Sequence, residues 1–417
     1  MKYGVLGKSL PHTYSPQIHA CFADYEYGIL ERSEEGVHGI FEGKEDLQGF
    51  NVTIPYKKLA MSLCREVSPE ASEVGAVNTV VKLPDGGFKG YNTDVFGFIY
   101  MLDREGIDVN GRKCLILGTG GASAAVFYAL KKLGASKISF CSRSGEINYT
   151  NVYDELPDTE VIINATPVGM FPEVDNCPIE LERFGSLIGV ADIIYNPSKT
   201  RFLQEGERLG LKTSGGLAML VAQAYEASLI FRGLKFEKTE EAVDDIERVI
   251  KKLEDQMLTI TLIGMPGSGK STIGRKIAEH LGREFIDLDD EFIKRYEVTP
   301  AQVIENKGED EFRRMETALA KDILPKPGLV VSTGGGIVTR EENSFFLKCN
   351  SRVIYIMRPL SCLMGQDTSD RPISRNTKIP ELLEKRSPLY VKNSDIIWNL
   401  PGFEEGDEIV DRLIKEL

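Results

Sequence analysis

The chain has 417 residues, 42% of them hydrophobic and 27% charged, and carries a formal net charge of −13. A chain of this length is expected to form two or three domains with sizeable cores. The acidic balance argues against nucleic acid or a membrane surface as the main partner, and no apolar run of about 18 residues predicts a transmembrane helix. Small molecules are the predicted partners.

Seven cysteines are scattered along the chain, without a C-x-x-C pair. This pattern predicts reduced thiols, no structural zinc and a cytoplasmic location. The N-terminal segment enters a predicted strand directly and shows no signal peptide. The sequence leaves the oligomeric state open, a homo-oligomer included.

The first hundred residues alternate short strands with polar segments. A strand over 3–7 precedes Ser15-Pro16, a pair typical of a helix start with serine as the N-cap. A second strand ends at Pro55, and polar residues follow two later strands, in the segments 75–79 and 90–94. Lys57 alone is compatible with a solvated lysine in the first turn of a helix.

Together these segments resemble the shikimate dehydrogenase family. The matching motifs are His12-Thr-Tyr-Ser-Pro16, Asn51-Val-Thr-Ile-Pro-Tyr-Lys57, Gly75-Ala-Val-Asn-Thr79 and Gly90-Tyr-Asn-Thr-Asp94. Reduction of a ketone by a nicotinamide needs a proton for the developing alkoxide, and the resemblance gives that task to Lys57 and Asp94. It implies that the substrate is bound by Thr13 (where the family usually has serine), Ser15, Thr53, Asn78 and Asn92.

A dinucleotide-binding pattern begins near residue 113. The strand Lys113–Leu117 is followed by Gly118-Thr-Gly-Gly-Ala-Ser123 and a helix of small residues. This is a Rossmann-type turn, although Ser123 replaces the third glycine. The predicted cofactor contacts are Gly118, Gly120, Gly121 and Ala122.

The next predicted strand, 137–141, ends in Ser142-Arg143-Ser144. An acidic residue at this point would favour NAD, whereas an arginine suits the 2′-phosphate of NADP. The predicted cofactor is therefore NADP(H), bound by Ser142, Arg143 and Ser144. Where the shikimate dehydrogenase family often has a second basic residue, this chain has Glu146-Ile147 instead.

Later segments extend the resemblance. Asn164-Ala-Thr-Pro-Val-Gly-Met170 resembles the loop that borders the dinucleotide, and Tyr195 and Gln223 align with substrate-binding residues. An amphipathic helix over 237–256 closes this part. We predict a substrate domain over 1–105, on which the helices near 220–256 pack back, and a dinucleotide domain over 106–256.

A phosphate-binding loop opens the last part of the chain. Gly264-Met-Pro-Gly-Ser-Gly-Lys-Ser271 lies between an apolar strand and a helical pattern. Such a loop directs backbone N–H groups at the phosphates of ATP, with Lys270 on the β/γ-phosphates and Ser271 on Mg²⁺. The predicted nucleotide contacts are Gly264, Gly267, Ser268, Gly269, Lys270, Ser271 and Thr272.

Beyond this loop the chain resembles shikimate kinase. The matching stretches are Phe285–Glu291, Gly308–Glu316, Leu329–Ile337, Asp370–Ile373 and Lys385–Tyr390. Strand alternation places Asp287 and Asp289 on one side, with Asp290 at the start of the next helix. The resemblance implies that Asp287 holds Mg²⁺ and that Asp289 orients or deprotonates the attacking hydroxyl. It also implies that Arg371 belongs to a mobile lid and neutralises charge on the transferred phosphoryl group. Shikimate would be bound by Asp289, Arg313, Gly334, Gly335, Gly336 and Arg386.

The predicted fold class is α/β throughout: an α/β substrate domain, a Rossmann domain and, over 257–417, a P-loop α/β/α kinase domain with a parallel sheet. The predicted function is bifunctional, with NADPH-dependent reduction of 3-dehydroshikimate followed by ATP-dependent phosphorylation of shikimate. One alternative is a quinate/shikimate dehydrogenase fused to a small-alcohol kinase. The other is an inactive metabolite sensor, although the residues for catalysis are present.

Overall fold

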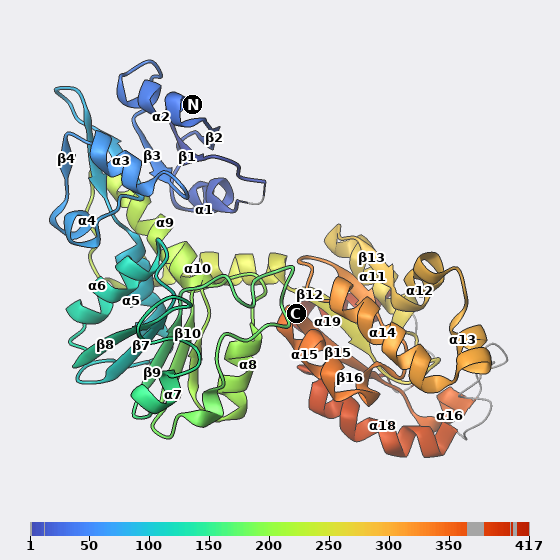
Figure 1. Cartoon of the computed structure of the whole chain (residues 1–417). Helices are drawn as coiled ribbons and strands as arrows, with labels where there is room; N and C mark the ends of the chain where they lie inside the picture. The colour runs from blue at the N-terminus through green and yellow to red at the C-terminus, as the bar shows by residue number, and fades with distance from the viewer. Residues whose placement is uncertain (1, 12, 365–378, 401, 403–406, 417) are drawn as a thin grey trace. The chain divides into compact units, whose positions relative to one another are not determined.

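A computed structural model describes residues 2–11, 13–364, 379–400, 402 and 407–416. Contacts divide it into two units: residues 1–168, 176–195 and 202–252, and residues 169–175, 196–201 and 253–417. The first unit has two sheets and the second has one (Figure 1). Each unit also has its own apolar core. In the part of the chain that is described, no helix is both long and apolar enough to span a bilayer.

The first unit starts with a six-stranded mixed sheet in the order β2-β1-β3-β5-β6-β4. Strands β1, β2 and β3 run parallel, whereas β5 is antiparallel to both β3 and β6. The elements are β1 (Tyr3–Gly7), α1 (Ser15–Phe22), β2 (Tyr27–Glu31), α2 (Glu34–Phe41), β3 (Gly49–Val52), α3 (Lys57–Leu63), β4 (Glu66–Val67), α4 (Pro69–Val74), β5 (Thr79–Lys82) and β6 (Phe88–Tyr91).

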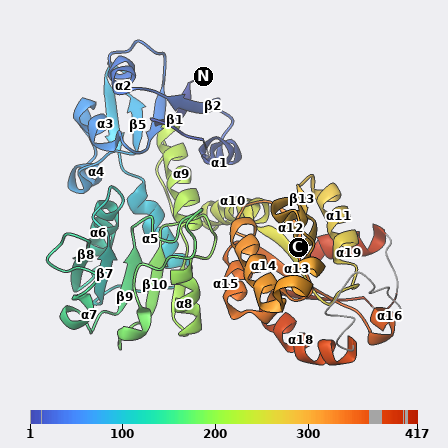
Figure 2. The ribbon, with the colours of Figure 1, turned by 45° about the vertical axis from the view of Figure 1, so that its right-hand side comes forward.

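A five-stranded parallel sheet follows in the same unit, in the order β11-β10-β9-β7-β8. Its elements are α5 (Asp94–Arg104), β7 (Lys113–Leu117), α6 (Ser123–Lys132), β8 (Lys137–Cys141), α7 (Val152–Glu155), β9 (Val161–Asn164), β10 (Gly189–Asp192), α8 (Arg201–Arg208), β11 (Lys212–Ser214), α9 (Leu217–Phe231) and α10 (Glu240–Met257). Helix α9 packs along α5 and also contacts α1 and β5 (Figure 2). Helix α9 therefore contacts both a strand of the first sheet and α5, the helix that precedes the second sheet.

The second unit holds a parallel sheet in the order β13-β14-β12-β15-β16. Its elements are β12 (Thr259–Ile263), α11 (Lys270–Leu281), β13 (Phe285–Asp287), α12 (Leu288–Tyr296), α13 (Pro300–Lys307), α14 (Glu309–Ile323), β14 (Val330–Ser332), α15 (Glu341–Cys349), β15 (Ser351–Met357), α16 (Leu360–Met364), α18 (Ile379–Asn393), β16 (Ile396–Asn399) and α19 (Asp407–Glu416).

Both faces of this sheet are buried, as its continuous apolar strands require. Along β15, Val353 and Tyr355 belong to one core cluster, while Ile354 and Ile356 belong to the cluster on the opposite face. The unit also includes two short segments from earlier in the chain. Val174 is fully buried in one of its clusters, and Ser198 Oγ donates to the Cys349 carbonyl at 3.0 Å.

Three local predictions differ from the structure. Ser15 is the first residue of α1 rather than its N-cap, because the cap position is occupied by Tyr14, which makes no side-chain cap. Asp289 lies in helix α12 and not on a strand, and that helix begins at Leu288 rather than Asp290. Strand β13 ends at Asp287 because its carboxylate accepts a hydrogen bond from the Asp289 N–H at 3.0 Å and caps the helix.

Candidate active sites

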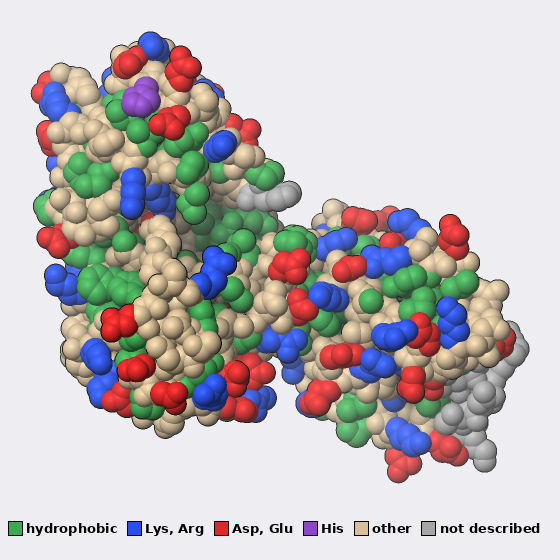
Figure 3. Space-filling view, viewed as in Figure 1, with side chains coloured by type: hydrophobic (Ala, Val, Ile, Leu, Met, Phe, Trp, Pro, Cys, Tyr) green, Lys and Arg blue, Asp and Glu red, His purple; other side chains and the backbone are tan. Residues whose placement is uncertain are grey.

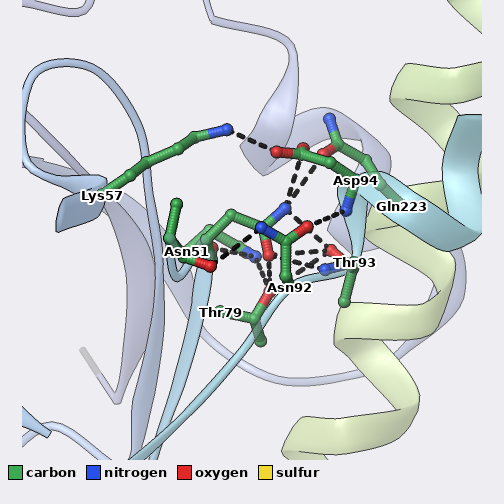
Figure 4. Close-up of polar contacts among 9 residues, drawn as sticks. Asn51, Lys57, Thr79, Asn92, Thr93, Asp94 and Gln223 are labelled. Atoms are coloured by element: carbon green, nitrogen blue, oxygen red, sulfur yellow. Dashed lines mark hydrogen bonds and ion pairs between the residues drawn. The ribbon is translucent and has the colours of Figure 1, made fainter. Parts of the chain in front are cut away.

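The first candidate site is built on an ion pair between two helix starts. Lys57 opens α3 and Asp94 opens α5, and Lys57 Nζ donates to Asp94 Oδ2 at 2.7 Å (Figure 4). The Asp94 side chain is 5% exposed and that of Lys57 is 19% exposed. The lysine side chain is thus more accessible than the buried carboxylate, an arrangement suited to passing a proton to a bound molecule.

Asparagine side chains hold this pair in place. Asn78 Nδ2 donates to Asp94 Oδ1 at 2.9 Å and lies 3.3 Å from Gln223 Oε1 on α9, while its own Oδ1 accepts from the Thr93 N–H at 2.8 Å. Asn92 Oδ1 accepts from the Asp94 N–H at 3.1 Å. The predicted residues Lys57, Asn78, Asn92, Asp94 and Gln223 are therefore brought together.

The network continues into residues to which the sequence analysis gave no role. Thr93 Oγ1 accepts from Asn78 Nδ2 at 3.1 Å, and Asn51 Nδ2 donates to Thr79 Oγ1 at 3.0 Å. Tyr27 then donates to Asn51 Oδ1 at 2.7 Å. Three of these residues, Asn51, Thr79 and Thr93, belong to the motifs already quoted. Tyr27 belongs to no motif, and only the structure shows that it is part of this network.

The remaining predicted substrate residues occupy loops and helix starts of the same unit. Thr13 Oγ1 donates to Ser15 Oγ at 3.2 Å, and Thr53 follows β3. Tyr195 follows β10, and its ring meets that of Tyr14 edge-on with centroids 6.1 Å apart. Tyr195 is protonated at neutral pH and can donate a hydrogen bond, and burial raises its pKa further above the ordinary value of 10.0.

The turn between β7 and α6 fits a dinucleotide phosphate. Gly118 has φ of +93°, and a Cβ there would lie 2.8 Å from Thr166 Cγ2. A Cβ added to Gly120 or Gly121 would meet no atom within 4 Å, so their backbone faces open space. Helix α6 begins at Ser123 and follows Ala122, the N-cap. Its N-terminus offers the N–H groups and the positive dipole end that bind phosphate.

The turn after β8 carries the predicted ribose contacts. The Ser142 N–H donates to the Ile147 carbonyl at 3.2 Å and closes the turn. Arg143 and Ser144 are exposed within it. A cationic, solvent-accessible guanidinium here fits a ribose 2′-phosphate.

The second candidate site is the loop between β12 and α11. Gly264, Gly267 and Gly269 all have positive φ, which lets the backbone curve around a phosphate. Lys270 opens α11, is 7% exposed and donates through Nζ to the carbonyls of Gly264 and Met265 at 3.1 and 3.0 Å. In addition to these residues, Ser268 is fully buried in the loop and Thr272 is exposed on α11.

The predicted magnesium ligands lie next to each other. Ser271 Oγ donates to Asp287 Oδ2 at 2.6 Å and lies 3.2 Å from Ser332 Oγ. Among the described residues, no three His, Cys, Asp or Glu side chains gather as a metal cluster. A hydroxyl and a carboxylate fit Mg²⁺, which keeps several waters and takes further ligands from nucleotide phosphates.

A buried ion pair lies beside the predicted acceptor site. Arg313 on α14 is 6% exposed, and its Nη1 donates to Glu316 Oε2 at 2.7 Å. Burial raises the pKa of Glu316, and nearby Asp289 raises it further, although Arg313 opposes both. Glu309 is a second partner, with Oε1 3.2 Å from Arg313 Nη2 and a side chain that is 50% exposed.

The glycine triplet makes room for these side chains. A Cβ on Gly336 would lie 2.0 Å from Arg313 Nη2, and one on Gly334 would lie 2.8 Å from Glu316 Oε1 and 3.2 Å from Asp289 Oδ1. The triplet therefore brings Asp289, Arg313 and Glu316 together by lacking side chains.

The second glycine of this triplet anchors helix α18. Arg386 Nη1 donates to the Gly335 carbonyl at 3.1 Å, and the Tyr390 hydroxyl also contacts that carbonyl. The motif residues Glu316 and Tyr390 received no role from the sequence analysis. Arg371, the predicted lid residue, lies outside the described residues.

The class of protein defined by these two units is a dinucleotide-linked dehydrogenase joined to a P-loop phosphotransferase. Over 257 residues the chain is 38% identical to the NADP(+) shikimate dehydrogenase of Caldicellulosiruptor bescii, and the match covers 55% of this chain and 88% of that relative. The chain therefore belongs to the shikimate dehydrogenase family.

Further comparisons agree for both units. Residues 5–80 match the model of the shikimate dehydrogenase substrate binding domain, and residues 266–417 match that of shikimate kinase. The structure of a chorismate mutase/shikimate 5-dehydrogenase fusion protein from Clostridium acetobutylicum is similar, with 34% identity, a TM-score of 0.54, and coverage of 60% of this chain and 97% of that chain.

A shikimate 5-dehydrogenase from Thermus thermophilus, in complex with NADP(H) and shikimate, is 29% identical, with a TM-score of 0.53 and coverage of 60% of this chain and 99% of that chain. The predicted α/β fold class and the predicted fusion are confirmed. The chain joins a shikimate dehydrogenase to a shikimate kinase domain and is a bifunctional enzyme of the shikimate pathway.

Proposed function

We propose that the first unit reduces 3-dehydroshikimate to shikimate with NADPH and that the second phosphorylates shikimate at its 3-hydroxyl with ATP. The observation that carries this proposal is the 2.7 Å contact between Lys57 Nζ and Asp94 Oδ2, in which the aspartate side chain is more deeply buried than the lysine. The proposed domains are 1–105 for substrate, 106–256 for NADPH and 257–417 for the kinase.

In the reduction, bound NADPH supplies the hydride. Lys57 donates a proton through Nζ to the oxygen that was the ketone, and Asp94 keeps the ammonium aimed at that oxygen. Asn78 Nδ2 donates to Asp94 Oδ1 and so fixes that carboxylate. The proposed contacts to the hydroxyls and carboxylate of the substrate are Thr13, Ser15, Thr53, Asn78, Asn92, Tyr195 and Gln223.

In the phosphorylation, Asp289 orients the attacking hydroxyl, and Arg313 and Arg386 bind the carboxylate of shikimate. Glu309 is the partner of Arg313 that this carboxylate would replace, because Glu309 is half-exposed whereas Glu316 is buried. Lys270 would leave the loop carbonyls to contact the phosphates. Bound Mg²⁺, held by Ser271 and Asp287, would neutralise phosphate charge, and Arg371 is proposed to add a positive charge from the lid.

The cofactor preference is proposed from the turn at 142–144. Arg143 is exposed there, so its charge is available to a 2′-phosphate. Small molecules are the proposed partners, and charges of both signs are interspersed over the face seen in Figure 3. The seven cysteines are free, which fits the proposed cytoplasmic location, where thiols stay reduced.

A coupled assay tests the proposal. With 3-dehydroshikimate, NADPH and ATP, we expect NADPH oxidation and formation of shikimate 3-phosphate, with NADH a poorer reductant. Oxidation of quinate as fast as that of shikimate would favour the quinate/shikimate dehydrogenase instead. Ligand binding without any turnover in either unit would favour the metabolite sensor.

A further inference from the structure

Arg358 is a buried arginine beside the phosphate loop that none of the proposed steps uses. It directly follows β15, and it is 6% exposed. Its Nε donates to the Ser268 carbonyl at 2.8 Å, and its Nη1 donates to the Gly402 carbonyl at 2.5 Å. The guanidinium therefore joins the phosphate loop to the segment that follows β16.

The third nitrogen of this guanidinium has no partner among the described residues. Arg358 Nη2 is buried and has no hydrogen-bond partner in the part of the chain that the structure describes. It lies 3.1 Å from the place that a Cβ on Gly269 would occupy, so it lies beside the residue that precedes Lys270. A buried guanidinium with an unused N–H is costly unless an anion or another acceptor compensates it.

The contact with Ser268 has a geometric consequence for phosphate binding. In a trans peptide the C=O of one residue and the N–H of the next point in opposite directions. Because Arg358 holds the Ser268 carbonyl, the Gly269 N–H points away from Arg358, an orientation in which it can donate to a phosphate oxygen bound by the loop. A cationic donor on that carbonyl also polarises the peptide and strengthens its N–H as a donor.

We propose that Arg358 is a nucleotide-positioning residue of the kinase site, which orients the Ser268–Gly269 peptide toward the nucleotide phosphates and whose buried charge those phosphates balance. The proposal rests on the proposed function only in that the second unit binds ATP. Arg358 acts through the loop, so its removal weakens nucleotide binding more than shikimate binding.

The test compares Arg358→Met, Arg358→Lys and Arg358→Gln with Arg352→Met in the full-length chain. Arg352 lies at the opposite end of the same strand and pairs with Asp255 at 3.5 Å. Binding of ADP with Mg²⁺ is measured by calorimetry, and KM for ATP and for shikimate by kinase assay. Folding of the second unit is checked by hydrogen exchange in peptides from its core strands β12 and β15, because dehydrogenase activity reports only the folding of the first unit.

We expect Arg358→Met to weaken ADP binding and to raise KM for ATP about tenfold or more, with KM for shikimate within about twofold of its original value. Arg358→Lys, which keeps the charge, should recover part of the loss, whereas Arg358→Gln should not. Arg352→Met should leave all three values unchanged.

Unchanged ADP affinity in folded Arg358→Met, or an equal rise in both KM values, would overturn the proposal. If Arg358→Met fails to fold, the proposal is tested by comparing the ADP affinities of Arg358→Lys and Arg358→Gln. Equal, unchanged affinities in these two variants would overturn it. ADP binding is measured without shikimate, so a failure of the shikimate kinase assignment is distinguishable from a failure of the role of Arg358.

Discussion

At the scale of single residues, the dehydrogenase site depends on the contact between Lys57 Nζ and Asp94 Oδ2. Removing the ammonium removes the proposed proton donor, whereas the kinase loop keeps its own lysine. We expect Lys57→Ala to lower kcat for reduction by a factor of about 10²–10⁴ and to leave phosphorylation unchanged. Both activities are measured on the same purified chain.

Two further variants complete this test. Lys58→Ala removes the exposed neighbouring lysine and should leave both activities intact. Lys270→Ala should abolish phosphorylation while reduction continues. Full dehydrogenase turnover in Lys57→Ala would show that the proton comes from another group.

A second residue-scale prediction concerns Glu226 on α9. Burial, together with nearby Glu70 and against the opposing effect of Lys132, raises the pKa of this carboxyl to about 8. Its Oε2 is buried without a hydrogen bond among the described residues. The folded state therefore holds a proton that the unfolded state, with an ordinary glutamate, releases above about pH 4.5.

This difference sets the sign of the pH dependence. The contribution of Glu226 to the free energy of unfolding is fully present below pH 4.5. It falls by up to about 1.4 kcal/mol per pH unit as the pH rises from there to about 8. We expect Glu226→Gln to remove this decline, seen as a flatter dependence of unfolding free energy on pH in urea titrations of the first unit. An equally steep decline in the variant would assign the proton to another group.

At the scale of elements, the turn after β14 shows why three glycines are needed in succession. Arg313 cannot simply move away from a new Cβ at position 336, because it is buried and bound to Glu316 at 2.7 Å. We expect Gly336→Ala to raise KM for shikimate in the kinase reaction at least tenfold. The measurement is a kinase titration with shikimate at saturating ATP.

Gly185→Ala is the control, since a Cβ there meets no atom within 4 Å. It should leave both activities unchanged, which separates the loss of space at Arg313 from the general effect of a glycine substitution. A normal KM for shikimate in Gly336→Ala would mean that Arg313 does not bind the acceptor.

At the scale of the whole molecule, two units with separate cores should respond separately to ligands. A ligand at 100 times its dissociation constant stabilises the state that binds it by about 2.7 kcal/mol. We expect NADP⁺ to slow hydrogen exchange in peptides that cover 118–123 and 142–144, and ADP with Mg²⁺ to slow it in peptides that cover 264–272.

Peptides from α2 in the first unit and from α15 in the second, remote in sequence from the proposed nucleotide sites, serve as references for the global stabilisation of each unit. Slower exchange at 264–272 with NADP⁺ alone would contradict the assignment of that cofactor to the first unit. Mass spectrometry of the full-length chain, digested after labelling, provides these measurements from one sample.

The sequence by itself determined the fold class and the two nucleotide-binding turns, whereas Lys57 and Asp94 were assigned through the resemblance of their motifs to a family. The two turns depend on local patterns: an apolar strand, a glycine-rich turn and a helix start place their polar groups at predictable points. The sequence also indicated Ser271 and Asp287 as neighbours, and the structure places their oxygens 2.6 Å apart.

Other features were decided only by tertiary structure. The prediction that Asp289 lies on a strand was wrong, because Asp287 caps α12 and the helix begins at the next residue. The contact of Arg358 with Ser268 joins residues 90 positions apart, and that of Tyr27 with Asn51 crosses between strands of one sheet. Local sequence patterns do not predict such contacts. The contacts form only when segments far apart in the sequence are brought side by side and their side chains are buried together.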